Sequence, residues 1–389
     1  MARGSAIVVG GGIGGLATAI ALSGRGWQVR VFERAPEFTE VGAGISLWAN
    51  ALRALDTIAE GVADQVRALS GAEVRGGIQN RTGRWLTRTD AAEVTRRYAP
   101  VILHRADLLR TLLDRVPPQA LVPGVEVVGV DADGDGVTIT HTSGQARADL
   151  VVAADGLRST VRRLVWPDAA PPRYAGYTAW RWVTPPLPAG AEGGGESWGL
   201  GARFGRAPLP DQRVYCYATA NTPEGATSPD GEATELRARF GDWHDPIPAL
   251  VAAAAATQVL RHDLYELPDL RSFARDRVVL LGDAAHAMTP NLGQGACQAL
   301  EDAATIGAVL EEEADLATAL AKYDRLRRPR TQDIVRRSRR LGAVGQWSWP
   351  LAVALRDRVL PLVPPSVAGR TLAPVLAWPP PGGITQRQR

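Results

Sequence analysis

The pattern best suited to chemistry is the segment Gly10-Gly11-Gly12-Ile13-Gly14-Gly15, which contains the spacing G-x-G-x-x-G. In such a segment the first glycine permits a tight turn, the second lets a pyrophosphate approach the backbone, and the third lets a helix pack closely on a strand. Glu33 follows about 20 residues on, where a carboxylate can accept hydrogen bonds from ribose hydroxyls. The pattern predicts a dinucleotide site at a helix N-terminus, without separating FAD from NAD.

Two later motifs favour FAD. One is the Asp-Gly motif VVAADGLRSTVR of residues 151–162, and the other is the Gly-Asp motif GDAAHAMTPNLGQG of residues 282–295. Each follows a short apolar run and precedes a predicted helix. Asp283 stands where a strand ends, and its carboxylate can accept a hydrogen bond from a ribityl hydroxyl. The glycines at 293 and 295 let backbone amides reach a ligand, and the positive end of the next helix stabilises an anionic reduced flavin by ~1–2 kcal/mol.

Together the three motifs resemble those of the group A flavoprotein monooxygenases, which have the para-hydroxybenzoate-hydroxylase fold. The resemblance covers residues 5 to 340 and is strongest to the compact subgroup of salicylate hydroxylases, FAD-dependent urate hydroxylase, hydroxynicotinate monooxygenases and zeaxanthin-epoxidase-like enzymes. It implies that NADH or NADPH reduces FAD, that O2 forms a flavin C4a-hydroperoxide, and that one oxygen hydroxylates a small aromatic or heteroaromatic substrate. No second glycine-rich βαβ unit is present, so NAD(P)H is expected to bind transiently in a groove.

The resemblance also implies roles for individual residues. Arg105 matches an arginine that lies along the ribityl chain and pyrophosphate of FAD, and Asp155 matches an aspartate that serves both FAD and NAD(P)H. A surface charge and a turn residue are the simpler interpretations of these two. Arg162 matches the arginine of the Asp-Gly motif. The expected cofactor-binding residues are Gly10, Gly12, Ile13, Gly14, Gly15, Glu33, Arg34, Gly44, Arg105, Val127, Asp155, Asp283, Gly293, Gly295 and Ala296.

The expected catalytic residues are Arg203, Tyr215 and Pro290. Arg203 and Tyr215 match substrate-side residues of urate hydroxylase, and an arginine there could hold an anionic or carbonyl-bearing ring by a bidentate contact. A structural strand arginine is an equal alternative. The segment 177–179 departs from the asparagine-bearing urate pattern, which weakens urate as the substrate. Pro290 matches a proline near flavin and substrate.

Other reactive or aromatic residues have competing interpretations. His286 could be a general base, but a strand-end histidine whose hydrogen bonds are satisfied is commoner. Cys297 is interpreted as a small packed residue rather than a redox thiol. Four further side chains could line an apolar pocket or pack in the core: Trp48, Asn50, Trp180 and Trp182.

The order of the elements predicts an α/β protein, in which a Rossmann-like FAD-binding domain carries an inserted, mainly antiparallel β-sheet substrate domain and C-terminal helices. The FAD-binding domain is assigned to 1–70, 101–172 and 271–345, the substrate domain to 71–100 and 173–270, and a helical tail to 346–389. We expect the tail to cover the substrate domain or a subunit interface rather than to enter a membrane.

Composition excludes several classes of function. The 389 residues carry a net charge of +3 without a basic stripe, so nucleic-acid binding is not expected. The two cysteines, Cys216 and Cys297, lie in unrelated contexts, so neither a metal site nor a disulfide is expected. No apolar run approaches the ~18–20 residues of a membrane span. We expect a cytoplasmic monomer or homodimer.

Three alternatives remain open. An epoxidase acting on an alkene would use the same FAD site, and a non-enzymatic FAD-binding protein would hold an unreactive flavin. The segment 180–185, Trp-Arg-Trp-Val-Thr-Pro, superficially resembles a flavin-dependent halogenase motif. Halogenases need a lysine near their tunnel, and the one lysine here, Lys322, lies on a predicted C-terminal helix far from it.

Overall fold

A computed structural model describes residues 3–38, 44–70, 76–88, 100–187, 194–364 and 372–381. Its first layer is a six-stranded sheet in the order β17-β18-β11-β1-β2-β7, in which only the edge strand β17 runs antiparallel to its neighbour. The strands are β1 (Gly4–Val9), β2 (Trp27–Glu33), β7 (Leu121–Pro123), β11 (Leu150–Ala153), β17 (Ala274–Arg275) and β18 (Val278–Leu280). The short apolar runs before the Asp-Gly and Gly-Asp motifs form two of these strands, β11 and β18. Their residues are apolar because both faces of a parallel sheet are covered.

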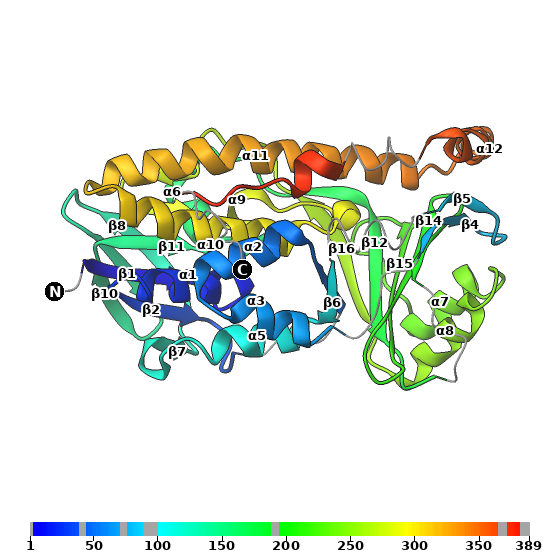
Figure 1. Cartoon of the computed structure of the whole chain (residues 1–389), viewed down its shortest axis with the longest axis horizontal. Helices are drawn as coiled ribbons and strands as arrows, with labels where there is room; N and C mark the ends of the chain where they lie inside the picture. Colours follow the sequence, from blue (N-terminus) through cyan, green and yellow to red (C-terminus); the bar gives the residue numbers. More distant parts are fainter. Residues whose placement is uncertain are drawn as a thin grey trace, which may run out of the picture.

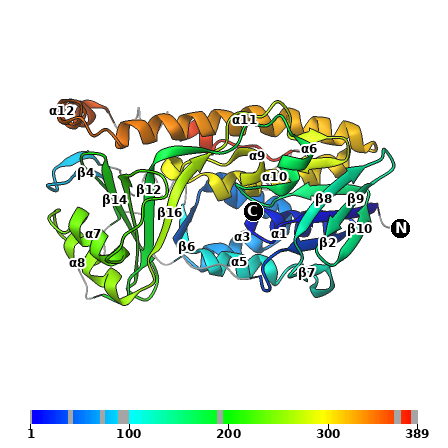
Figure 2. The ribbon, with the colours of Figure 1, turned by 180° about the vertical axis from the view of Figure 1, so that it is seen from behind.

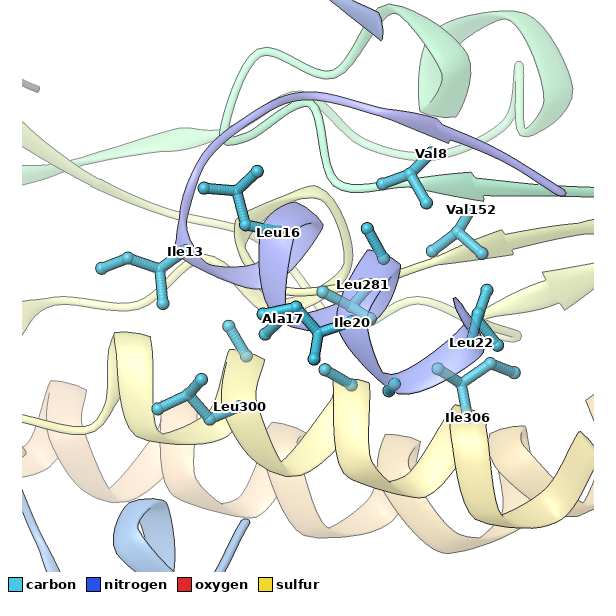
Figure 3. Packing of buried hydrophobic residues seen from close by; sticks show 14 of the residues in the cluster. Val8, Ile13, Leu16, Ala17, Ile20, Leu22, Val152, Leu281, Leu300 and Ile306 are labelled. Atoms are coloured by element: carbon cyan, nitrogen blue, oxygen red, sulfur yellow. The ribbon is translucent and has the colours of Figure 1, made fainter. Parts of the chain in front are cut away.

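Helices cover this sheet and build the largest core cluster. In Figure 3, Leu16 and Ile20 of α1 lie between Val8 and Val152 of the sheet and Leu300 of α10. The α1 helix ends at Gly24, whose amide donates to the carbonyl of Ile20. The helices of this part are α1 (Ile13–Ser23), α2 (Ala49–Ile58), α3 (Val62–Ala68), α5 (Arg105–Leu113), η1 (Pro118–Ala120), α6 (Thr160–Val165), α9 (Asp283–His286), η3 (Pro290–Leu292) and α10 (Gly295–Glu312).

A second sheet of seven strands stands beside the first, in the order β16-β12-β15-β14-β13-β4-β5. Its pairs are antiparallel except for β13 with β4. Figures 1 and 2 show α7 and α8 on the face turned away from the first sheet. The elements are β4 (Gly77–Asn80), β5 (Trp85–Arg88), β12 (Arg173–Val183), β13 (Gly195–Trp198), β14 (Ala202–Pro208), β15 (Val214–Asn221), α7 (Glu232–Phe240), α8 (Ile247–Ala253), η2 (Ala254–Ala256) and β16 (Leu260–Glu266).

Two small sheets complete the strands. One pairs β3 (Gly44–Leu47) with β6 (Val101–His104), and the other has the order β10-β9-β8. The latter strands are β8 (Val127–Ala132), β9 (Val137–His141) and β10 (Gly144–Ala148).

The long helix α11 (Leu316–Gly345) runs over both large sheets, as Figures 1 and 2 show. The chain then forms α12 (Pro350–Val359) and η4 (Leu360–Leu362) at the end of the molecule opposite the N-terminus. The described residues 372–381 lie back on the first part of the fold, where Arg53 and Arg330 donate to the carbonyls of Leu376 and Val375. The predicted α/β fold class is confirmed, and the described part of the predicted tail contains α12 and η4.

Candidate functional site

The three sequence motifs meet at one edge of the first sheet. Because β18, β11, β1 and β2 are neighbours and parallel, the residues that follow each of them lie side by side at their carboxyl ends. The amide of Gly10 donates to the carbonyl of Phe32 at 2.7 Å. A Cβ on Gly10 would overlap the carbonyl oxygen of Ala154, next to Asp155. Segments more than a hundred residues apart therefore form one loop cluster.

The surroundings of the glycines differ along the Gly10–Gly15 loop. Gly10 has a φ of +105°, which favours glycine. A Cβ on Gly15 would overlap the carbonyl oxygen of Gly10, so the turn cannot close over a larger residue. Gly14 faces α10, since a Cβ there would lie 2.8 Å from Leu281 and 3.2 Å from Ala299. No atom of the described residues lies within 4 Å of such a Cβ on Gly12, so the described part of the chain leaves the space beside it open.

The helices α1 and α10 run parallel, with their N-termini at the same end. Gly14 lies opposite Ala299, and about two turns later Ala21 lies opposite Gly307. Figure 3 shows the same alignment from Ile13 to Leu22 beside Leu300 to Ile306. Like Gly12 at the start of α1, Gly295 at the start of α10 has no described atom within 4 Å of where a Cβ would stand. Two helix dipoles and their free N–H groups thus point into one region, which suits an anionic ligand.

Glu33 holds the glycine loop. Its Oε2 accepts the Gly11 amide at 2.7 Å and its Oε1 accepts the Ala35 amide at 2.8 Å. Arg34 beside it is exposed. Val127, also expected at the cofactor, has its side chain buried in the main core, two residues beyond Val125, whose amide donates to the carbonyl of Glu33.

The Asp-Gly motif contributes a carboxylate with one unused oxygen. Asp155 Oδ2 accepts the Val161 amide at 3.1 Å, whereas its buried Oδ1 has no partner among the described residues. Arg162 is buried and donates to the carbonyl oxygens of Ala284 at 2.8 Å and Leu157 at 2.6 Å. Burial lowers the pKa of Arg162, and the nearby charge of Asp155 opposes this. Arg162 therefore joins the Asp-Gly motif to the Gly-Asp motif through backbone contacts.

The Gly-Asp motif presents its carboxylate to the outside. Asp283 is the exposed first residue of α9, and no hydrogen bond or ion pair of its side chain occurs within the described part of the chain. Pro290 is the exposed first residue of η3. Gly293 has a φ of +60°, and a Cβ on it would lie 3.1 Å from the indole nitrogen of Trp48. These positions leave Asp283 available to a ligand.

A network of buried charged side chains, which sequence reasoning missed, supports the Gly-Asp motif from the interior of the fold. Asp302 Oδ2 accepts the Gly282 amide at 3.0 Å and contacts His286 Nε2 at 2.6 Å, while its Oδ1 accepts Arg327 Nε at 2.6 Å. Burial by itself raises the pKa of Asp302, but the charges of His286 and Arg327 outweigh this and hold it at about 2. His286 is thus a buried partner of a carboxylate, which favours the structural interpretation over a general base.

The second carboxylate of the network, Glu301, is connected through Asn50 to Gln294, the residue before Gly295. It pairs with Arg327 at 2.5 Å and with Arg330 at 2.7 Å, and its Oε1 accepts Asn50 Nδ2 at 2.7 Å. Asn50 also donates to Gln294 Oε1 at 3.0 Å, directly beside Gly295. The adjacent acids 301 and 302, flanked by apolar residues in the middle of a predicted helix, were the sequence signal that could have indicated this network.

The substrate-side candidates are not all in one place. Arg203 is buried, donates to Gln346 Oε1 at 3.0 Å and to Asn291 Oδ1 at 2.6 Å, and lies 5.8 Å from the centre of the Tyr177 ring. It therefore lies beside the η3 segment that begins at Pro290, with its guanidinium already bonded to the protein.

Tyr215 lies instead at the junction of the second sheet with β3. A Cβ on Gly44 would overlap the Tyr215 ring, so glycine is required there. Burial raises the pKa of Tyr215, and the charges of Arg181 and Arg105 oppose this rise. Arg105, the exposed first residue of α5, is thus placed near Tyr215.

The paired tryptophans of β12 are core residues. Trp180 and Trp182 pack with Phe204 against α7 and α8, and the indole N–H of Trp182 donates to the carbonyl of Leu250 at 3.2 Å. That is the face turned away from the first sheet, so the core interpretation of these residues is favoured. Lys322 pairs with Glu312 at 2.8 Å on the α10–α11 side of the fold.

Both cysteines are expected to be inert in the folded protein. They are fully buried, and burial raises the pKa of the Cys297 thiol to about 12 and that of Cys216 still further. Only the thiolate reacts rapidly. Iodoacetamide at pH 8 should leave the native protein unmodified and alkylate both residues after denaturation, as measured by intact mass. Rapid labelling of Cys297 in native protein would contradict this.

Comparison with known proteins agrees with this geometry. The FAD binding domain family matches residues 3–338, so the chain belongs to that family. An aurachin C monooxygenase/isomerase from Stigmatella aurantiaca is 40% identical over 360 residues, covering 91% of this chain and 93% of the relative. An FAD-dependent urate hydroxylase from Klebsiella pneumoniae is 34% identical over 344 residues, covering 86% and 88%. The structure of Klebsiella pneumoniae HpxO with FAD and uric acid matches with a TM-score of 0.87 and 29% identity over 97% and 98% of the two chains.

These relatives confirm the resemblance to group A flavin monooxygenases and the expected class of enzyme, an FAD-dependent monooxygenase. No helix in the described ranges is long and apolar enough to cross a membrane.

Proposed function

We propose that the chain is an NAD(P)H-dependent monooxygenase that hydroxylates a small aromatic or heteroaromatic compound. The observation that carries the proposal is the parallel alignment of α1 and α10, whose open N-termini face the carboxyl ends of four parallel strands. A long dinucleotide with a central pyrophosphate and a redox ring at one end fits two such helix ends, one facing the pyrophosphate and one facing the redox ring.

The residues present fit FAD. The open space at Gly12 would take the pyrophosphate, and Asp283 would accept a ribityl hydroxyl. The unpartnered Asp155 Oδ1 has the chemistry of a hydrogen-bond acceptor for a ligand. Gly295 would offer its helix N-terminus to the pyrimidine edge of the flavin. When bound, FAD supplies the chemistry of hydride acceptance and oxygen transfer.

The protein's own residues would orient the substrate and exclude water. The sheet face opposite α7 and α8 carries Tyr177, Arg181 and Tyr215, since side chains alternate along each strand and their neighbours Trp180 and Trp182 are in the core. Tyr217, on the same face, donates to Glu196 Oε1 at 2.7 Å. Aromatic rings with cationic and hydroxyl donors suit a planar ring that bears oxygen substituents.

The relatives narrow the compounds to test. Their names indicate action on aurachin C, on urate and on 3-amino-4-hydroxybenzoate, all compounds with electron-rich rings. We propose a substrate of that chemical class, and we propose the cytoplasm as its compartment, where NADH and NADPH are supplied.

A turnover screen tests the function. Purified FAD-loaded protein should consume NADH or NADPH faster when a quinolone, phenol or purine is added, and mass spectrometry should find a product with one added oxygen. The control is the same protein without an aromatic compound. Stimulation by an alkene alone, with an epoxide as product, would replace the hydroxylase by an epoxidase. A bound flavin that no compound and no nicotinamide reduces would show a binding protein instead.

Asp283→Ala should weaken FAD binding by about tenfold to a hundredfold, the size of a lost hydrogen bond to a charged group. FAD retention on gel filtration and fluorescence titration measure this. Asp168→Ala is the matched control, because Asp168 is also exposed and lies outside the loop cluster. Equal FAD affinity in the two variants would remove Asp283 from the site.

A further inference from the structure

An exposed apolar surface lies at the end of the molecule that carries α12. Among the described residues, seven of the eleven exposed large hydrophobic side chains fall between Trp347 and Val363. We call these exposed apolar side chains the α12 surface. Trp349, Leu351, Leu355 and Leu362 are exposed by 65%, 67%, 60% and 78%. Such clustering in one short stretch marks an interaction site, whereas single exposed leucines do not.

The geometry of α12 presents this surface outward. Leu351, Leu355 and Val359 are four residues apart, so they share one face of the helix. On the opposite face Arg356 is buried, with its guanidinium 5.3 Å from the centre of the Trp198 ring and 2.9 Å from Asp357 Oδ1. The helix is therefore fixed to the second sheet by its polar side, and no described residue covers its apolar side.

Two exposed arginines of the described residues border the α12 surface. Arg358 is exposed on the helix, and the exposed Arg84 of the neighbouring turn donates to the carbonyl of Asp357 at 2.9 Å. The one acid between Trp347 and Val363 is Asp357, whose carboxylate is already paired with Arg356. An apolar helix face with tryptophan at its start and arginine at its border has the composition of a helix that lies in a lipid interface.

We propose that the α12 surface docks the protein on an anionic lipid membrane, with Leu351, Leu355 and Leu362 in the acyl boundary and Arg84 and Arg358 at the headgroups. A second copy of the chain fits less well. A stable dimer needs about 20–30 residues on each side, whereas this surface comes from one ten-residue helix and its flanks. Figures 1 and 2 show α12 projecting at the tip of an elongated molecule, where a flat bilayer can reach it.

Vesicle sedimentation of the full-length FAD-loaded protein tests the proposal without any turnover, so it does not depend on the proposed reaction. Wild-type protein should pellet with vesicles of phosphatidylcholine and phosphatidylglycerol, and less with phosphatidylcholine alone. Leu351→Glu/Leu355→Glu should lower the partition coefficient at least about tenfold. Arg358→Gln should weaken binding only to the anionic vesicles.

The matched control is Val128→Glu/Leu164→Glu, because these side chains are also exposed, by 50% and 44%, on a different part of the surface. It should pellet as the wild type does, and retained FAD absorbance shows that both double variants are folded. Wild-type protein that stays in the supernatant with both vesicles overturns the proposal. So does sedimentation equilibrium in which the wild type is a dimer, Leu351→Glu/Leu355→Glu is a monomer and vesicles bind neither.

Discussion

Asp302→Ala is expected to lower the free energy of unfolding by about 3–5 kcal/mol, the cost of leaving a buried charge without its partner. The carboxylate is fully buried and receives contacts from Gly282, His286 and Arg327. Its loss would leave the Arg327 guanidinium to share Glu301 with Arg330. Since Gly282 immediately precedes Asp283, FAD affinity should fall as well. Urea denaturation and FAD titration measure the two effects.

Glu312→Ala provides the control for Asp302→Ala. Glu312 ends the same helix, but its ion pair with Lys322 is solvent-accessible, and Lys322 retains Glu313. Such pairs contribute no more than about 1 kcal/mol. If the two variants lost equal stability, the buried network would not have the structural importance assigned to it.

The same carboxylate has a predictable dependence on pH. The folded-state pKa of Asp302 is about 2, below the ~3.9 of an unfolded aspartate. A lowered pKa stabilises the fold fully above the unfolded value, and this contribution is lost as pH falls through the folded value. The stability difference between wild type and Asp302→Ala should therefore shrink as pH falls from about 4 to about 2. A constant difference over that range would contradict the charged state of Asp302.

Gly15→Ala and Gly12→Ala should separate folding of the glycine loop from FAD binding. A methyl group on Gly15 would overlap the backbone oxygen of Gly10, so the apoprotein should lose about 3 kcal/mol of stability. Gly12 has an extended conformation that alanine also adopts, with φ −74° and ψ −176°, and its surroundings are open. Gly12→Ala should therefore change apoprotein stability by less than about 1 kcal/mol yet weaken FAD binding at least about tenfold.

Thermal unfolding of apoprotein and FAD titration of both variants provide the measurements. An unchanged FAD affinity in Gly12→Ala would mean that the open space beside Gly12 is not where the pyrophosphate binds. An apoprotein of wild-type stability in Gly15→Ala would show that the loop can rearrange around a Cβ.

The sequence predicted the cofactor side of the fold well because its signals are local. Gly10, Gly12 and Gly15 each act through a backbone conformation or a close approach within a few residues, which spacing records directly. The segment from Tyr174 to Trp182 has residue types that alternate between the two faces of a sheet, and it forms nearly all of β12. Period-two and glycine patterns depend on the chain's own geometry, so they survive without knowledge of distant partners.

Other residues could not be assigned in this way because their roles depend on distant partners. Arg203 was equally compatible with a substrate contact and a structural strand residue, and its bonds to Gln346 and Asn291 come from segments 143 and 88 residues away. His286 became a buried partner only through Asp302. Neither the sequence positions nor the residue types indicate which face of a strand or helix becomes enclosed.

By itself, the sequence determined the α/β fold class and the dinucleotide-binding loop, because turns, helix starts and strand periods are set by neighbouring residues. The resemblance of its three motifs to a known family indicated the flavin monooxygenase class. Only the tertiary structure decided that two helix N-termini point into one space, that a charge network supports the Gly-Asp motif, and that the described residues leave the apolar face of α12 exposed. These features are set by long-range packing, in which burial and pairing depend on segments that meet only after folding.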